Sequence, residues 1–141
     1  MSSIARTARH ELAIAAADLV GTPFRLHGRD PKLGLDCIGL VAASLTAIGT
    51  RCNPPRGYRL RNTCIFHWLD CAIQSGLVET EEPIASGDVI LVQPGPGQHH
   101  LLICETIRSF LHAHAGLGKV VRTHGPLAWP AGKIWRLNKS S

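Results

Sequence analysis

Aromatic residues are scarce in this chain of 141 residues, since Phe, Trp and Tyr together make up 5% of it. Proteins that bind single-stranded nucleic acid usually stack its bases on aromatic side chains, so the scarcity argues against such a module. The net charge is +5, from 15 Lys and Arg against 10 Asp and Glu. A basic surface suits polyanions of several kinds and selects none of them, so we predict no specificity for nucleic acid.

Long apolar segments are also missing. The segment from Ile4 to Val20 is interrupted by charged side chains, so it resembles neither a secretory signal nor a membrane span. We therefore expect a protein that is synthesised in the cytoplasm without a signal peptide and does not insert into a membrane. If its substrate lies outside the cytoplasm, another component must deliver the protein there.

The five cysteines include no Cys-x-x-Cys pair, which argues against a zinc ribbon and against a thioredoxin motif. An odd number of cysteines without a dense framework fits a chain that folds in a reducing compartment. Four of them are expected to be small buried residues, namely Cys52, Cys64, Cys71 and Cys104. The fifth, Cys37, lies in a different setting.

The length suits a single domain over residues 1–141. Apolar residues recur at helical spacing before Pro23, and two further helices are expected over residues 37–48 and 63–74. After Pro83 the spacing becomes that of strands, with runs at 88–92, 99–105, 108–114, 120–123 and 133–137. Helices followed by an antiparallel sheet predict an α+β domain.

Cys37 is expected at the first turn of a helix. Asp36, directly before it, is a good N-cap because its carboxylate can accept hydrogen bonds from the free N–H groups of that turn. The same end of a helix favours a thiolate over a thiol, and its N–H groups can face a developing oxyanion. The pattern indicates a cysteine nucleophile.

Two histidines twelve residues apart lie on two predicted strands that form a hairpin. If His100 pairs directly with His112, the two rings touch, and one can orient the other as a general base. A slip of one residue would instead bring His99 to this face. Gln98 and His114 alternate onto the face of His100 and are expected to line the cleft.

Five segments occur in an order that resembles the NlpC/P60 family of papain-like cysteine peptidases: Gly21–Arg25, Gly34–Val41, Gly87–Leu91, His100–Ile103 and Phe110–Ala113. The resemblance implies helices packed on a C-terminal antiparallel sheet and hydrolysis of amide bonds in peptidoglycan stem peptides. It assigns Cys37 as nucleophile, His100 as base and His112 as orienting residue, with no cofactor and no metal. Residues expected near the substrate are Phe24, Arg25, Asp36, Gln98 and His114.

A short form without a signal and with a residue other than serine after the cysteine is similar to peptidases encoded with phage tails and gene-transfer particles. The resemblance implies tail hub or tip proteins as partners. It also implies a particle-associated protein that opens the cell wall locally from the periplasmic side for DNA delivery.

Two positions depart from the family pattern. Phe24 stands where the family usually has a tyrosine whose hydroxyl helps at the oxyanion site, and Ile38 stands where it usually has serine. Arg25 or His27 is available to replace the missing donor. These departures keep open a catalytically silent docking subunit of a tail tip. A zinc site built from histidines and a cysteine is a third hypothesis, with candidate ligands His99, His100, His112 and His114.

Overall fold

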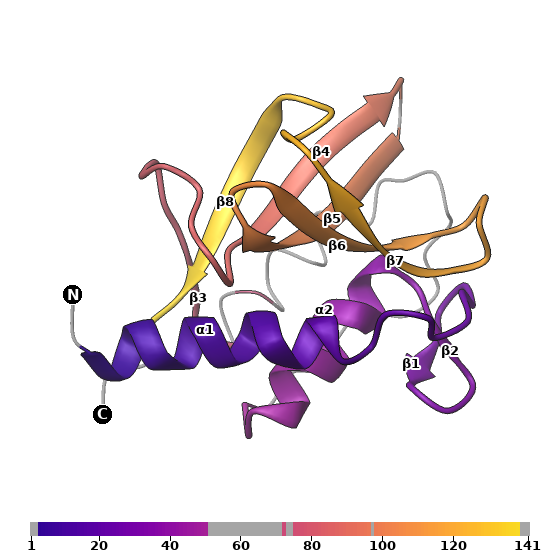
Figure 1. Ribbon diagram of the computed structural model, residues 1–141, viewed down its shortest axis with the longest axis horizontal. Coiled ribbons are helices and arrows are strands. Elements are labelled where there is room, and N and C mark those ends of the chain that lie inside the picture. Colours follow the sequence, from indigo (N-terminus) through magenta and orange to yellow (C-terminus); the bar gives the residue numbers. More distant parts are fainter. Residues whose placement is uncertain (1–2, 51–71, 73–74, 97, 139–141) are drawn as a thin grey trace.

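The structure is a computed structural model that describes residues 3–50, 72, 75–96 and 98–138. Two helices, α1 (Ser3–Ala17) and α2 (Cys37–Ala47), pack beneath one face of a six-stranded antiparallel sheet (Figure 1). The predicted α+β class is therefore confirmed. The helix predicted over residues 63–74 lies outside the described residues, apart from Ala72, which is helical. No helix in the described ranges is long and apolar enough to cross a membrane.

The sheet has the strand order β3-β8-β4-β5-β6-β7. Its strands are β3 (Leu77–Glu79), β4 (Val89–Gly95), β5 (Gln98–Thr106), β6 (Ser109–His114), β7 (Lys119–His124) and β8 (Ala131–Leu137). A separate pair, β1 (Arg29–Asp30) and β2 (Gly34–Leu35), forms a small hairpin before α2. The sequence predicted β4 to β8 and did not predict β1, β2 or β3.

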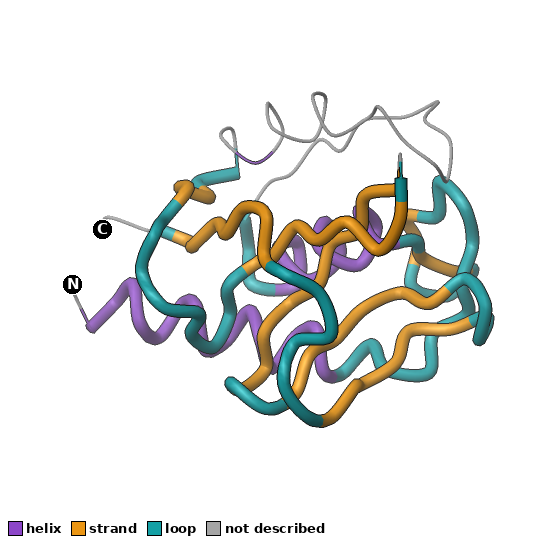
Figure 2. Tube along the Cα trace, turned by 90° about the horizontal axis from the view of Figure 1, so that it is seen from above, coloured by secondary structure: helices purple, strands orange, loops and turns teal. Residues whose placement is uncertain are grey.

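The sheet carries apolar side chains on both faces, because alternate residues of a strand point to opposite sides. Leu101 and Ile103 of β5 join the cluster that the two helices cover, which also holds Leu12 and Leu40. Leu102 and its neighbours on the other face form a second cluster with Cys104, Phe110, Leu127 and Trp129. Seen from above, strands of the sheet cross in front of α2 (Figure 2).

The register of the β5–β6 hairpin differs from the predicted one. Cys104 pairs with Phe110, whereas the prediction placed Cys104 opposite Arg108 and His100 directly opposite His112. The turn of the hairpin lies at Ile107 and Arg108, and a bulge between Cys104 and Thr106 shifts the pairing by one residue beyond the turn. Since side-chain direction has a period of two, the predicted faces are unchanged.

Candidate active site

Cys37 is the first residue of α2, as the sequence predicts. Asp36 caps the helix with an extended backbone, at φ −98° and ψ −169°, and its Oδ1 accepts a hydrogen bond of 2.8 Å from the N–H of Gly39. Cys37 is half-buried and packs against the core cluster beneath the sheet. The capped start of the helix thus holds the thiol at the edge of the core.

Asp36 also fixes the loop before the helix. Its Oδ2 accepts a 2.8 Å bond from the N–H of His27, and its Oδ1 lies 3.0 Å from a guanidinium nitrogen of Arg29. His27 has a φ of 64°, a left-handed conformation that is uncommon outside glycine, and this bond helps to hold it. Asp36 is only 2% exposed, and its bonds position the loop and the helix. Its predicted contact with substrate stays a prediction.

Gly39 allows that loop to lie directly against the helix. A Cβ atom on Gly39 would stand 2.0 Å from the carbonyl oxygen of Gly28, a distance that no carbon side chain tolerates. The sequence places this glycine in the first turn but gives no sign of its partner. The close approach of two backbones is therefore the physical reason for glycine at this position.

A series of backbone hydrogen bonds connects the start of α2 to the histidine-bearing strands. Leu35 donates to the carbonyl of Pro23 at 2.9 Å, and Phe24 donates to the carbonyl of Gly118 at 2.8 Å. Gly118 in turn donates to the carbonyl of His114 at 2.8 Å. The segment before Cys37 and the end of β6 are thus held at the same end of the molecule.

The rings of His100 and His112 are in contact, as the twelve-residue spacing predicts. His100 Nε2 lies 3.0 Å from His112 Nδ1, and the rings meet edge to face with their centroids 5.1 Å apart. The residues are diagonal neighbours across the hairpin rather than directly opposite, because the register is shifted by two. The contact needs only the shared face, which the prediction had right.

Both imidazoles are held in the neutral form. Burial, with the nearby His112 and His114, lowers the pKa of His100 from 6.5 to about 4. Burial and His114 lower the pKa of His112 from 6.5 to about 4 as well. At neutral pH, each ring therefore carries one proton and one unprotonated nitrogen, which is the state that a general base requires.

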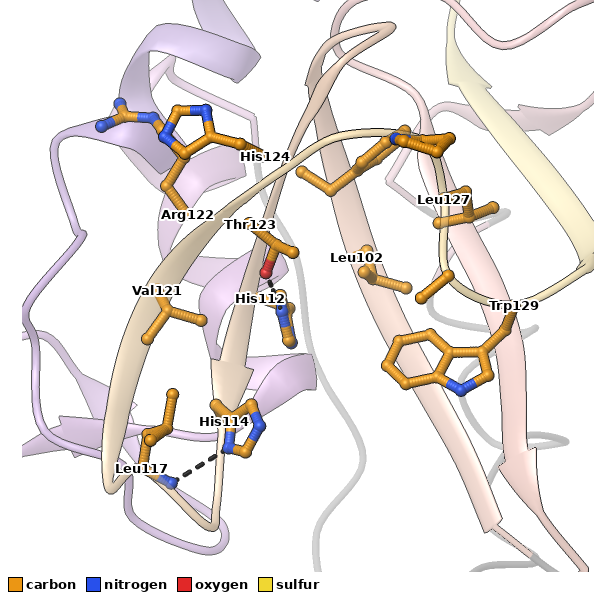
Figure 3. Close-up of a pocket in the computed structure, with 13 residues that line it drawn as sticks. Leu102, His112, His114, Leu117, Val121, Arg122, Thr123, His124, Leu127 and Trp129 are labelled. Atoms are coloured by element: carbon orange, nitrogen blue, oxygen red, sulfur yellow. Dashed lines mark hydrogen bonds between the residues drawn. The ribbon is translucent and has the colours of Figure 1, made fainter.

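Sequence reasoning missed Thr123 of β7. Its Oγ1 lies 2.8 Å from His112 Nε2, on the side of the ring opposite His100. His112 and Thr123 line a groove of about 510 Å³ whose other wall includes Leu127 and Trp129 (Figure 3). No sequence signal links positions 112 and 123, because only the register of β6 on β7 brings them together.

The predicted substrate residues have different settings. His114 is half-buried with its ring 5.6 Å from that of His112, and its Nδ1 accepts a 3.0 Å bond from the N–H of Leu117. Phe24 is half-buried against the core, and Arg25 beside it is exposed. Gln98 is half-buried at the start of β5. The structure thus brings His114 to the imidazole pair and leaves Arg25 free to reach solvent.

The third hypothesis, a zinc site, finds no arrangement of ligands to support it among the described residues. No three side chains of His, Cys, Asp or Glu in the described ranges lie together in a group that could hold a metal ion.

The sequence model described as the NlpC/P60 family matches residues 21–129. The fold is similar to the P60 domain of antigen MAP1204 from M. avium subspecies paratuberculosis, with a TM-score of 0.65 and 17% identity over 97% of this chain and 99% of that one. It is also similar to the peptidoglycan hydrolase RipB from Mycobacterium tuberculosis, with a TM-score of 0.63 and 22% identity over 99% of this chain and 70% of that one.

NlpC1 from Trichomonas vaginalis has a similar fold as well, with a TM-score of 0.68 and 18% identity over 94% of this chain. This chain spans 45% of the length of NlpC1 and 47% of NlpC2 from the same organism. No curated protein matches the sequence.

Proposed function

This chain belongs to the NlpC/P60 family, and we propose that it is a cysteine peptidase that hydrolyses amide bonds in peptidoglycan stem peptides. The observation that carries the proposal is the contact between the neutral rings of His100 and His112. Backbone hydrogen bonds connect the strand end that bears this pair to the segment before the Cys37 helix. A similar structure described as a peptidoglycan hydrolase, RipB, supports the choice of substrate.

The first step is proton transfer from Cys37 to His100. Because His100 Nε2 contacts His112, the nitrogen available to take the thiol proton is Nδ1. The thiolate then attacks the amide carbonyl carbon, and the carbonyl oxygen becomes an oxyanion. The backbone N–H groups at the start of α2, beside the thiol, are proposed to stabilise this oxyanion.

The second half of the reaction releases both products. His100 returns its proton to the leaving amine as the C–N bond breaks, and the acyl group stays on the sulfur as a thioester. A water molecule then loses a proton to His100 and attacks the thioester carbon. The C–S bond breaks, the carboxylic acid leaves, and the Cys37 thiol is restored.

Substitution of the cysteine tests the proposal. We expect Cys37→Ala and Cys37→Ser to abolish the clearing of purified sacculi and the release of new amine termini. Their melting temperatures should stay close to that of the wild type, because the half-buried thiol contributes little to the core. Hydrolysis by Cys37→Ala at the wild-type rate would refute the assignment.

A second candidate function is a catalytically silent subunit that docks at the tip of a tail. Phe24 and Ile38 favour it, since both lack the hydroxyl that the family usually has there. Iodoacetamide separates the two functions, and Cys104 is an internal reference because burial, with Asp88 and Glu105 nearby, raises its pKa to about 12. An enzyme requires fast alkylation of Cys37 at neutral pH, whereas a thiol as inert as Cys104 would favour the silent subunit.

We also propose that a phage tail or gene-transfer particle carries the protein to the periplasmic face of the wall, with tail hub or tip proteins as partners. The support is the resemblance of the block around Asp36, Cys37 and Ile38 to peptidases of such particles. Immunoblots of purified particles test the proposal. Absence of the protein from intact particles, with the protein present in the producing cells, would contradict it.

A further inference from the structure

We propose that Thr123 is a positioning residue that fixes the location of the proton on the His100–His112 pair, an inference that rests on the proposed function. Its hydroxyl lies 2.8 Å from His112 Nε2, and His112 Nδ1 lies 3.0 Å from His100 Nε2. The three side chains thus form one continuous hydrogen-bonded row across β5, β6 and β7. Figure 3 shows Thr123 directed at the His112 ring from the neighbouring strand.

The register explains why Thr123 reaches this ring. Val121 is the residue of β7 that pairs with His112, and Thr123 pairs with Phe110. Residues 121 and 123 share one face of the sheet with His112, so Thr123 is its diagonal neighbour. The Thr123 hydroxyl therefore reaches Nε2 of the His112 ring from the same face of the sheet.

The proposed reaction allows only one arrangement of protons. His100 Nδ1 must be unprotonated to take the thiol proton, so the proton of neutral His100 is on Nε2. That N–H donates to His112 Nδ1, which must then be a lone pair, and so the proton of His112 is on Nε2. The Nε2–H of His112 needs an acceptor, and Thr123 Oγ1 is the acceptor in place.

The arrangement also remains satisfied during the reaction. When His100 takes the thiol proton it becomes an imidazolium, and its Nε2–H still donates to His112 Nδ1. No proton has to leave His112, so each hydrogen bond of the row is still donated in the direction from His100 to Thr123. Thr123 therefore acts on the rate through the ring of His112 and does not touch substrate.

Removal of the hydroxyl leaves the active arrangement without its last partner. His112 is 4% exposed, and the groove beside it is lined largely by apolar side chains such as Leu102, Val121 and Trp129. A buried N–H without an acceptor is unfavourable, so His112 would shift its proton to Nδ1. That proton would face His100 Nε2 and move the proton of His100 to Nδ1, where it blocks acceptance of the thiol proton.

Two substitutions separate the hydroxyl from the shape of the side chain. Thr123→Val keeps the β-branched form and removes the hydroxyl, whereas Thr123→Ser keeps the hydroxyl. Two-bond ¹H–¹⁵N spectra of the imidazoles report which nitrogen carries the proton. We expect the wild type and Thr123→Ser to have Nε2–H on both rings, and Thr123→Val to shift His112 towards Nδ1–H.

Cleavage of sacculi gives the second measurement. We expect kcat to fall about fivefold in Thr123→Val, the size of one lost hydrogen bond, with KM nearly unchanged and kcat preserved in Thr123→Ser. A wild-type spectrum with Nδ1–H on His112, or identical spectra for the wild type and Thr123→Val, would overturn the inference. If the wild type itself does not cleave sacculi, the proposed function fails, and the spectra alone still decide the role of Thr123.

Discussion

At the scale of single residues, the candidate site depends on two histidine rings that burial keeps neutral. His112 is almost fully buried and His100 half-buried, and both have a pKa of about 4. In an unfolded chain the same rings would have a pKa near 6.5. The difference couples the protonation of the site to the stability of the fold.

This coupling predicts a stability that falls with acid. Between pH 6.5 and about 4 the unfolded chain binds protons that the folded rings do not, so the free energy of unfolding rises with pH across this window. We expect a loss on the order of 3 kcal/mol for His112 as the pH falls from 7 to 4. Urea unfolding of the wild type at several pH values measures this loss.

His112→Gln is the control for this prediction, because glutamine does not titrate. The variant should be less stable at pH 7, since it loses the contact with His100, and its stability should depend less on pH between 4 and 6.5. Equal pH slopes for the wild type and His112→Gln would show that other groups cause the acid sensitivity.

At the scale of secondary-structure elements, α2 and the loop before it are held together by a backbone contact at Gly39. The contact lets Asp36 reach the cap of α2 and the loop residues His27 and Arg29 together. The position of Cys37 therefore depends on how closely the loop can approach the helix.

Gly39→Ala should disturb this approach. The new methyl group would stand 2.0 Å from the carbonyl oxygen of Gly28, so the loop must move, at a cost of about 1–3 kcal/mol. We expect lower stability in urea unfolding and slower alkylation of Cys37 by iodoacetamide. Gly132→Ala in β8 is the matched control, because its methyl group would meet only the Leu91 carbonyl at 3.3 Å. If both variants behaved alike, the contact at Gly39 would have no special importance.

Sequence periodicity is sufficient for long elements and insufficient for short ones. α1, α2 and the five strands β4 to β8 have enough residues to display a period, whereas β1 and β2 have two residues each and β3 has three. The predicted hairpin register lies two residues from the observed one, because the alternation of side chains has a period of two and does not distinguish registers that differ by two residues.

The candidate site divides in the same way. Cys37, His100 and His112 could be proposed from the cap pattern, from their spacing and from a family resemblance. The contacts of Thr123 and Gly39 could not, since each depends on which segments of chain become neighbours in the folded state. The catalytic roles of Cys37, His100 and His112 and the positioning role of Thr123 remain predictions that the variants above test.

At the scale of the whole molecule, a buried ion pair joins the last strand to the start of β4. Arg136 on β8 donates two hydrogen bonds, of 2.9 and 2.8 Å, to the two carboxylate oxygens of Asp88, which is fully buried. Asp88 also accepts a 2.9 Å bond from the N–H of Ala85, in the segment just before the strand. The pair holds together strands that lie 48 residues apart in sequence.

Arg136→Met should therefore destabilise the whole fold. The substitution leaves the Asp88 carboxylate buried without its partner, and the expected cost is about 3–5 kcal/mol. Lys133→Met on the same strand breaks an exposed pair with Glu79, with side chains 47% and 54% exposed, and should cost less than about 1 kcal/mol. Thermal and urea unfolding of both variants compare the two pairs. Equal losses of stability in the two variants would contradict the expectation that the buried pair contributes more than the exposed one.

The two parts of the candidate site come from opposite halves of the chain. Cys37 begins α2 in the first third, whereas His100, His112 and Thr123 belong to strands that are complete only near residue 124. A ribosome must therefore synthesise the strands up to β7 before the Cys37 thiol and the two imidazoles can meet. A product that ends before β5 would contain the thiol without its imidazoles, so it would lack the proposed catalytic pair.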